Sequence, residues 1–209
     1  DDAPLLRTSV LDSLIDVAVR NVSRGIGDVA LYEVGNVTTS AGVVPAPIPG
    51  VAQRPSQAEI EALAAGTPRQ RLHLGAILCG QHGYSGVLQH VRNWDWADAV
   101  ELVRDIASLL GVKLHVANAE RAPWHPGRCA EIRIVVPTKN PTRPQIGEVI
   151  GYAGELHPRI VKKLGLPERA CAVELDLDAL IECSSKQPVV KAQPVSTYPA
   201  AKEDFAFVV

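Results

Sequence analysis

The chain has 209 residues, 46% of them hydrophobic and 21% charged, and a formal net charge of -2 from 21 Lys and Arg against 23 Asp and Glu. This composition supports a folded core and excludes a disordered or fibrous chain. It also excludes a strong positive field over the whole chain for nucleic acid, although a local basic face can still act. The chain contains no methionine, so we expect a segment of a longer protein.

The first expected element is a helix with the apolar stripe Leu11 to Val22, ending near Gly25 or Gly27. Ser9 and Asp12 stand at the spacing of a capping box. Residues 28–37 are apolar on both parities and β-branched, which predicts a central strand covered on both faces.

Prolines at 45, 47, 49 and 55 predict a surface loop over residues 38–55. A short helix over 57–65 and a buried strand over 71–79 follow. Asp95 then precedes a strong apolar stripe that ends at Gly111, which predicts a capped helix.

Strands are expected over 113–118, 130–136 and 147–155, the last two as an antiparallel pair joined by a loop at 137–144. Pro158 suits the first turn of a short helix that ends before Gly165. Alternation from Cys171 to Asp178 predicts a strand buried on one face only. Antiparallel strands with helices inserted between them predict an α+β fold.

The sequence contains no motif typical of phosphate binding, nucleophilic catalysis or metal binding. The glycines of residues 80–86 match neither a phosphate loop nor a nucleophile elbow and suit a plain turn. The six histidines and the four cysteines show no metal-ligand spacing, and the scattered thiols fit a reducing cytosol. Asp176 and Asp178 are expected on one strand face, as solvated carboxylates. Apolar runs are about half the roughly 20 residues of a membrane span, and no secretion leader is evident.

Two clusters hold candidate binding residues. Trp94, Trp96 and Trp124 fall within about 30 residues, and the last runs into His125-Pro126-Gly127-Arg128; they suit a core, a ligand pocket or a partner interface. Arg159, Lys162, Lys163 and Arg169 surround one helix. They either complement its negative end or contact RNA phosphate.

Four segments in this order resemble the C-terminal part of the bacterial phenylalanyl-tRNA synthetase β subunit. The segments are Leu6-Arg7-Thr8-Ser9, Asp28-Val29-Ala30-Leu31-Tyr32-Glu33-Val34-Gly35, Trp124-His125-Pro126-Gly127-Arg128-Cys129-Ala130-Glu131 and Ile150-Gly151-Tyr152-Ala153-Gly154-Glu155-Leu156-His157-Pro158. The likeness continues through Leu180, while the proline-rich residues 38–70 are unspecific. Residues 196–209 resemble the opening strand of the ferredoxin-like anticodon-binding domain that follows in this family.

The resemblance implies two domains and a fold. Residues 1–190 would form a class II aminoacyl-tRNA synthetase catalytic-like domain, an antiparallel sheet flanked by helices, and 191–209 the start of the anticodon-binding domain. Class II catalysis needs an arginine in an R-x-E context and another in a glycine-rich stretch; Arg128 and Arg133 stand at the wrong spacing. The resemblance therefore implies a catalytically silent copy.

The resemblance also implies partners. The family works as an (αβ)2 heterotetramer in the cytoplasm, in which the α subunit uses ATP and Mg²⁺ to attach phenylalanine to tRNA. This segment would hold no cofactor, bind no DNA, and assemble with α and position tRNA. Arg7, Trp94, Trp96, Trp124, His125 and Arg128 are the candidates for subunit contacts or structure, and Arg159, Lys162 and Lys163 for RNA contact. Two alternatives stay open: a domain that activates an amino acid itself, and an independent RNA-binding module.

Overall fold

A computed structural model describes residues 5–40, 42–46, 48–83, 86–87, 91–136, 145–187, 192, 197–199 and 201–208. Six strands form one antiparallel sheet in the order β1-β2-β8-β7-β6-β5. These strands are β1 (Val29–Thr39), β2 (Arg69–Cys79), β5 (Leu114–Asn118), β6 (Trp124–Val136), β7 (Gln145–Leu156) and β8 (Cys171–Asp176). The helices are α1 (Leu11–Ser23), α2 (Gln57–Ala65), α3 (Trp96–Leu109), α4 (Pro158–Leu164) and α5 (Leu177–Ser185). The α+β prediction is confirmed.

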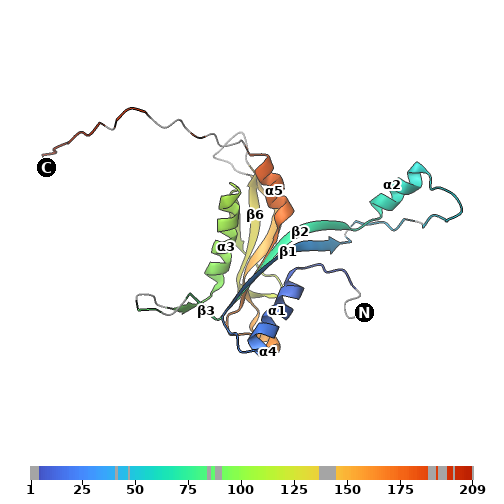
Figure 1. Cartoon of the computed structure of the whole chain (residues 1–209), viewed down its shortest axis with the longest axis horizontal. Coiled ribbons are helices and arrows are strands. Elements are labelled where there is room, and N and C mark those ends of the chain that lie inside the picture. Colours follow the sequence, from blue (N-terminus) through green and yellow to red (C-terminus); the bar gives the residue numbers. More distant parts are fainter. Residues whose placement is uncertain are drawn as a thin grey trace.

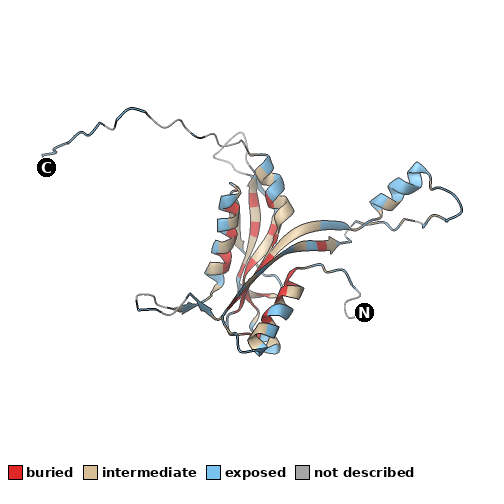
Figure 2. Cartoon of the chain, viewed as in Figure 1, coloured by how far each residue is buried: buried red, intermediate tan, exposed pale blue. Residues whose placement is uncertain are grey.

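Helices cover both faces of this sheet (Figure 1). On one face α3 and α5 pack against side chains such as Val173 and Ile132, and on the other α1 and α4 pack against Ile77 and Ala172. Buried residues are concentrated where the helices meet the sheet (Figure 2). The two apolar layers therefore share the same central strands.

The strand predicted to be central lies at the edge of the sheet, and the strand predicted to be buried on one face only is central. β1 lies at an edge of the sheet and not at its centre, and Tyr32 and Val34 on it are 76% and 45% exposed. β8 lies between β2 and β7, so Ala172 and Val173 are both fully buried although they face opposite sides. The alternation of residue types does not predict this burial, because the second face of β8 carries the small residue Ala172 and α1 packs over it.

The N-terminus of α3 is capped by a side chain that the sequence predicts, whereas that of α1 is not. Asp95 caps α3 through the amide of Ala97, as predicted, and Asp98 completes a capping box that was not predicted. At α1 the predicted capping box between Ser9 and Asp12 is wrong: Val10 is the N-cap without a side-chain bond, and the Ser9 hydroxyl donates to Glu174 and accepts from the Leu11 amide at 3.1 Å.

The paired aspartates do not lie on one strand face. Asp176 ends β8 and caps α5 by accepting from the amide of Ala179, and Asp178 accepts from the amide of Leu72. The predicted strand over residues 171–178 therefore ends early, and the helix α5 that follows it was not predicted. At α4, Pro158 occupies the first turn and Gly165 adopts a left-handed C-cap with φ +67°, as predicted.

Two segments extend away from the sheet (Figure 1). The β1 and β2 strands continue into an arm that ends in α2, where Ser56 and Glu59 form a capping box and no residue is buried. Residues 201–208 belong to no helix or strand, and Phe205 and Phe207 are exposed. The second domain stays a prediction.

The glycine loop begins with the first strand of a small hairpin. Gln81 and His82 (β3) pair with Asn93 and Arg92 (β4), within the described residues around the loop. Residues 84, 85 and 88–90, like the predicted loop at 137–144, lie outside the described residues.

Candidate functional site

An open cleft of about 710 Å³ lies on the α1 side of the sheet. The cross-strand register places Glu131, Tyr152 and Glu174 in one row on this side. Arg121 is the only arginine among the described residues that line the cleft, and its guanidinium lies 5.5 Å from the ring centre of Tyr152. Arg133 donates to Glu131 over 2.7 Å and holds the pKa of that carboxyl below its usual value.

This arrangement does not suit a nucleotide polyphosphate. A phosphate clamp needs cations aimed at the oxygens where negative charge develops. Here Arg121 lies over an aromatic ring, and Arg133, which donates to Glu131 and to the Gly147 carbonyl, is not among the residues that line the cleft. The described part of the cleft therefore presents an acidic and aromatic wall.

Glu174 anchors the start of α1 to the central strand. Its carboxylate accepts from the Ser9 hydroxyl at 2.6 Å, the Val10 amide at 3.1 Å and lies 3.1 Å from His73 Nδ1. Burial by itself would raise the pKa of Glu174, but these hydrogen bonds outweigh burial and hold the pKa below its usual value. An ionised carboxylate at the start of a helix is stabilised by the free amides there.

A second carboxylate holds α1 from the edge strand. Glu33 accepts from the Ser13 hydroxyl at 2.7 Å and forms an ion pair with Arg7, and the Ser13 and Arg7 bonds lower its pKa. Gly75 lies opposite both Glu33 and Glu174 in the register. A Cβ on Gly75 would lie 2.5 Å from Cγ2 of Val10, so only glycine lets the helix come this close. Arg7 is therefore a structural residue here, one of the two roles predicted for it.

The two His-Pro segments meet at one end of the sheet. Trp124 pairs with Leu156 in the register, the rings of His125 and His157 stack with centres 6.4 Å apart, and the His157 amide donates to Pro123 at 2.9 Å. The contacts join two segments that were singled out separately in the sequence.

A buried carboxylate lies beside this junction. Glu155 is only 2% exposed, and it accepts from Arg128 at 2.6 Å and from Arg169 at 2.9 Å and 3.1 Å. Arg169 is the one described non-glycine residue with a positive φ, +64°, a conformation that costs about 1–2 kcal/mol. Its two bonds to Glu155 offset this cost. Sequence reasoning missed Glu155, although the His-Pro dipeptide repeated beside Arg128 and Glu155 was a usable signal.

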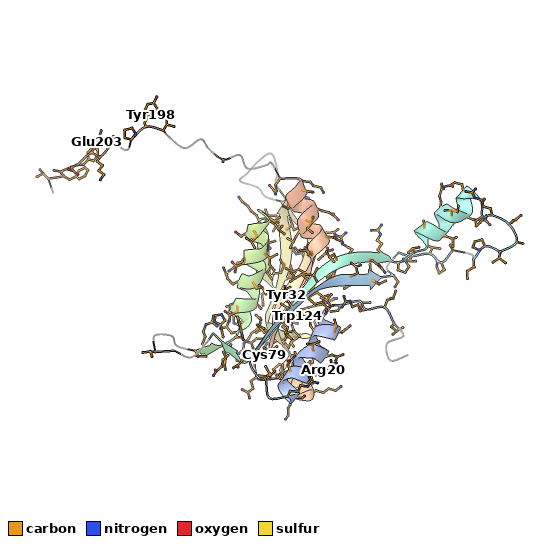
Figure 3. All side chains as sticks on the ribbon, viewed as in Figure 1. Arg20, Tyr32, Cys79, Trp124, Tyr198 and Glu203 are labelled. Atoms are coloured by element: carbon orange, nitrogen blue, oxygen red, sulfur yellow. The ribbon has the colours of Figure 1, made fainter. Side chains whose placement is uncertain are left out.

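The three tryptophans have different environments. Trp124, labelled in Figure 3, is buried, and its Nε1 donates to the Ala172 carbonyl at 2.9 Å. Trp94 packs against the α3 layer and meets the ring of His82 edge-on. Trp96 is 46% exposed and lines a groove of about 590 Å³ with Arg128. The core option is therefore confirmed for Trp124.

The predicted RNA candidates lie together on α4. Arg159, Lys162 and Lys163 are exposed, and the last two stand in the final turn of the helix. Arg169 is near them but is bound to Glu155. Their contact with RNA stays a prediction.

The thiols show the chemistry of core residues. Cys79, Cys129 and Cys171 are buried and all four cysteines are free. Burial raises the pKa of the Cys79 and Cys129 thiols to about 11 and that of Cys171 further. No group of three or more His, Cys, Asp or Glu that could hold a metal ion occurs among the described residues. In the same part of the chain, no helix is long and apolar enough to cross a membrane.

Comparison with known proteins gives one consistent result. A family model described as the phenylalanyl tRNA synthetase beta chain CLM domain matches residues 1–177. Phenylalanine–tRNA ligase beta subunits of Thermobifida fusca and Streptomyces avermitilis are 41% and 42% identical over all of this chain, and that of Corynebacterium glutamicum is 40% identical over 98% of it. The chain spans about a quarter of the length of these relatives, 24%, 24% and 23%.

Proposed function

The chain belongs to the phenylalanyl tRNA synthetase beta chain CLM domain family, and from this premise we propose that it serves in the β subunit of phenylalanine–tRNA ligase. In that enzyme it would help attach phenylalanine to tRNA, as a scaffold that assembles with the α subunit and positions tRNA. The match over residues 1–177 carries the proposal.

The domain itself is proposed to be catalytically silent. Its six-stranded antiparallel sheet with helices on both faces suits the class II catalytic-like fold. On the open cleft, however, Arg121 is the only arginine among the described lining residues, and it lies over Tyr152 beside the carboxylates of Glu174 and Asp176. These residues do not fit ATP with Mg²⁺, so we assign both to the α subunit and derive no chemical step here.

The assembly surface is proposed to be the face of the edge strand β1 that is turned away from α1. Tyr32 and Val34 project from β1 as exposed side chains, on the face of the sheet opposite to Glu33 and α1. Apolar and aromatic side chains of this kind are typical anchors of protein interfaces. The complex would be the cytoplasmic (αβ)2 heterotetramer.

Co-expression of the full β chain with the matching α subunit tests the assembly role. Tyr32→Asp combined with Val34→Asp is expected to reduce co-purification at least tenfold, which corresponds to about 1.4 kcal/mol. Ile48→Asp, a charge introduced at an exposed apolar residue of the arm, is the matched control and should co-purify normally. Unchanged co-purification of the double variant would refute this surface.

Exchange of pyrophosphate into ATP tests the silent role. The 209-residue chain with phenylalanine should show no exchange above the background, whereas the complex with α should exchange. Exchange by the chain alone would show that it is an enzyme in its own right.

A further inference from the structure

A second cleft lies between α4, the end of β7 and Arg128. It has a volume of about 660 Å³, and its charged lining residues are Arg128, Lys162 and Arg169 with Glu155 and Glu168. The arginine side chains are 45% and 46% exposed, so each guanidinium reaches both the buried carboxylate and the solvent of the cleft.

Glu155 fixes the direction of the two guanidiniums. Arg169 makes two bonds to one carboxylate oxygen, and Arg128 bonds the other oxygen. A guanidinium has five N–H donors, so each arginine keeps donors beyond those used on Glu155. A planar fork that is held in place loses less entropy when it binds a second oxyanion.

Positive charge continues from the cleft along the exposed side of α4. Arg159 and Lys163 add two exposed cations next to Lys162. The cleft and helix together carry five cations against two carboxylates, in a chain whose formal net charge is -2. A row of cations of this length suits a polyanion better than a single phosphate.

We propose that the cleft formed by Arg128, Glu155, Arg169 and Lys162 binds phosphates of an RNA backbone, with Arg159 and Lys163 extending the contact along α4. The inference rests on the proposed function in one respect: the RNA is the tRNA of the synthetase. It adds a place on this domain where that RNA is held. Bases are not read here, because the contacts are made with phosphate.

Binding of tRNA to the assembled enzyme at several salt concentrations tests the site. Each lost phosphate contact should make the negative slope of log K against log salt less steep by about 0.7–0.9. Near 0.15 M salt this corresponds to an affinity about four- to fivefold weaker. Lys162→Gln should show this loss, and Arg159→Gln with Lys163→Gln should add to it. Lys186→Gln, on an exposed lysine that follows α5, is the matched control and should bind like the wild type.

Arg169→Lys distinguishes the contribution of the oriented guanidinium from that of its positive charge. It keeps the cation and loses the paired bonds to Glu155, so tRNA binding should weaken while the melting temperature reports whether the domain is still folded. Wild-type affinity in both Lys162→Gln and Arg169→Lys would overturn the proposal. So would an equal loss in Lys186→Gln, or weaker assembly with α at unchanged tRNA affinity, which would indicate a protein partner. Failure of the proposed function would appear differently, as a β chain that does not assemble with α.

Discussion

Alanine at residue 75 is expected to disturb the closest approach between α1 and the sheet. Its Cβ would lie 2.5 Å from Cγ2 of Val10 and 2.9 Å from Cδ1 of Leu14. Carbon atoms pack at about 3.5–4.0 Å, so α1 would move by about 1 Å. Val10 cannot turn aside, because it is fully buried and its β-branched side chain is stiff.

The size of the effect follows from two opposing terms. Overpacking costs about 1–3 kcal/mol, whereas removing a glycine from the unfolded chain stabilises by about 0.4–1 kcal/mol. We expect Gly75→Ala to lower the free energy of unfolding by about 1–2 kcal/mol. The melting temperature should fall by about 2–4 °C per kcal/mol in a chain of this size.

Urea unfolding followed by tryptophan fluorescence measures this change, since the buried Trp124 belongs to the same apolar layer as α1. Gly27→Ala is the matched control: no atom lies within 4 Å of its added Cβ and no positive φ is required, so its stability should be unchanged or slightly higher. Equal urea midpoints for the two variants would refute the close packing of α1 on Gly75.

Three further results are expected. Arg128→Ala and Arg169→Ala should each destabilise the chain, and the double variant should lose more than the sum, because Glu155 would be buried without a partner; an additive cycle in urea unfolding would contradict this. Because Glu174 has a lower pKa in the folded chain than its ordinary 4.5, its ionised form stabilises the fold fully above pH 4.5, and this contribution is lost as the pH falls through the folded-state pKa. The deficit of Glu174→Gln at pH 7 should therefore shrink on acidification, and a deficit that is independent of pH would contradict the ionised anchor. Among the four cysteines, Cys183 should be alkylated first at pH 8, because the other three are buried; mass spectrometry that finds them modified equally fast would contradict their burial.

The local elements could be predicted because their determinants are adjacent in sequence. The residues 57–65 form α2 within the predicted bounds, Asp95 starts α3, and Pro158 with Gly165 bounds α4. Caps, prolines and left-handed glycines act within one helical turn, so a single chain reveals them. The α+β class follows from the order of these elements.

The candidate site could be predicted only in part, because its members are separated in sequence. Trp124, His125 and Arg128 were singled out, but the partners that give them a role were not. Glu155 meets Arg128 across 27 residues and Arg169 across 14, because the β6–β7 register brings Arg128 to it and the β7–β8 register brings Arg169. Likewise Ser9 was expected to form a local capping box with Asp12, whereas its hydroxyl accepts from the Leu11 amide and donates to Glu174, which is 165 residues away in the sequence.

The sequence by itself determined which segments are strands, and the tertiary structure decided which of them are central. Residues 28–37 are apolar on both parities and still form an edge strand whose Tyr32 is exposed, because apolar side chains do not by themselves bring another element of the chain over them. Cys171 to Asp176 alternate and still form the central strand, because Ala172 is small enough for α1 and α4 to pack over it and Glu174 is satisfied by hydrogen bonds from Ser9 and Val10. Burial depends on what packs against a strand, and a strand's own residues do not contain that information.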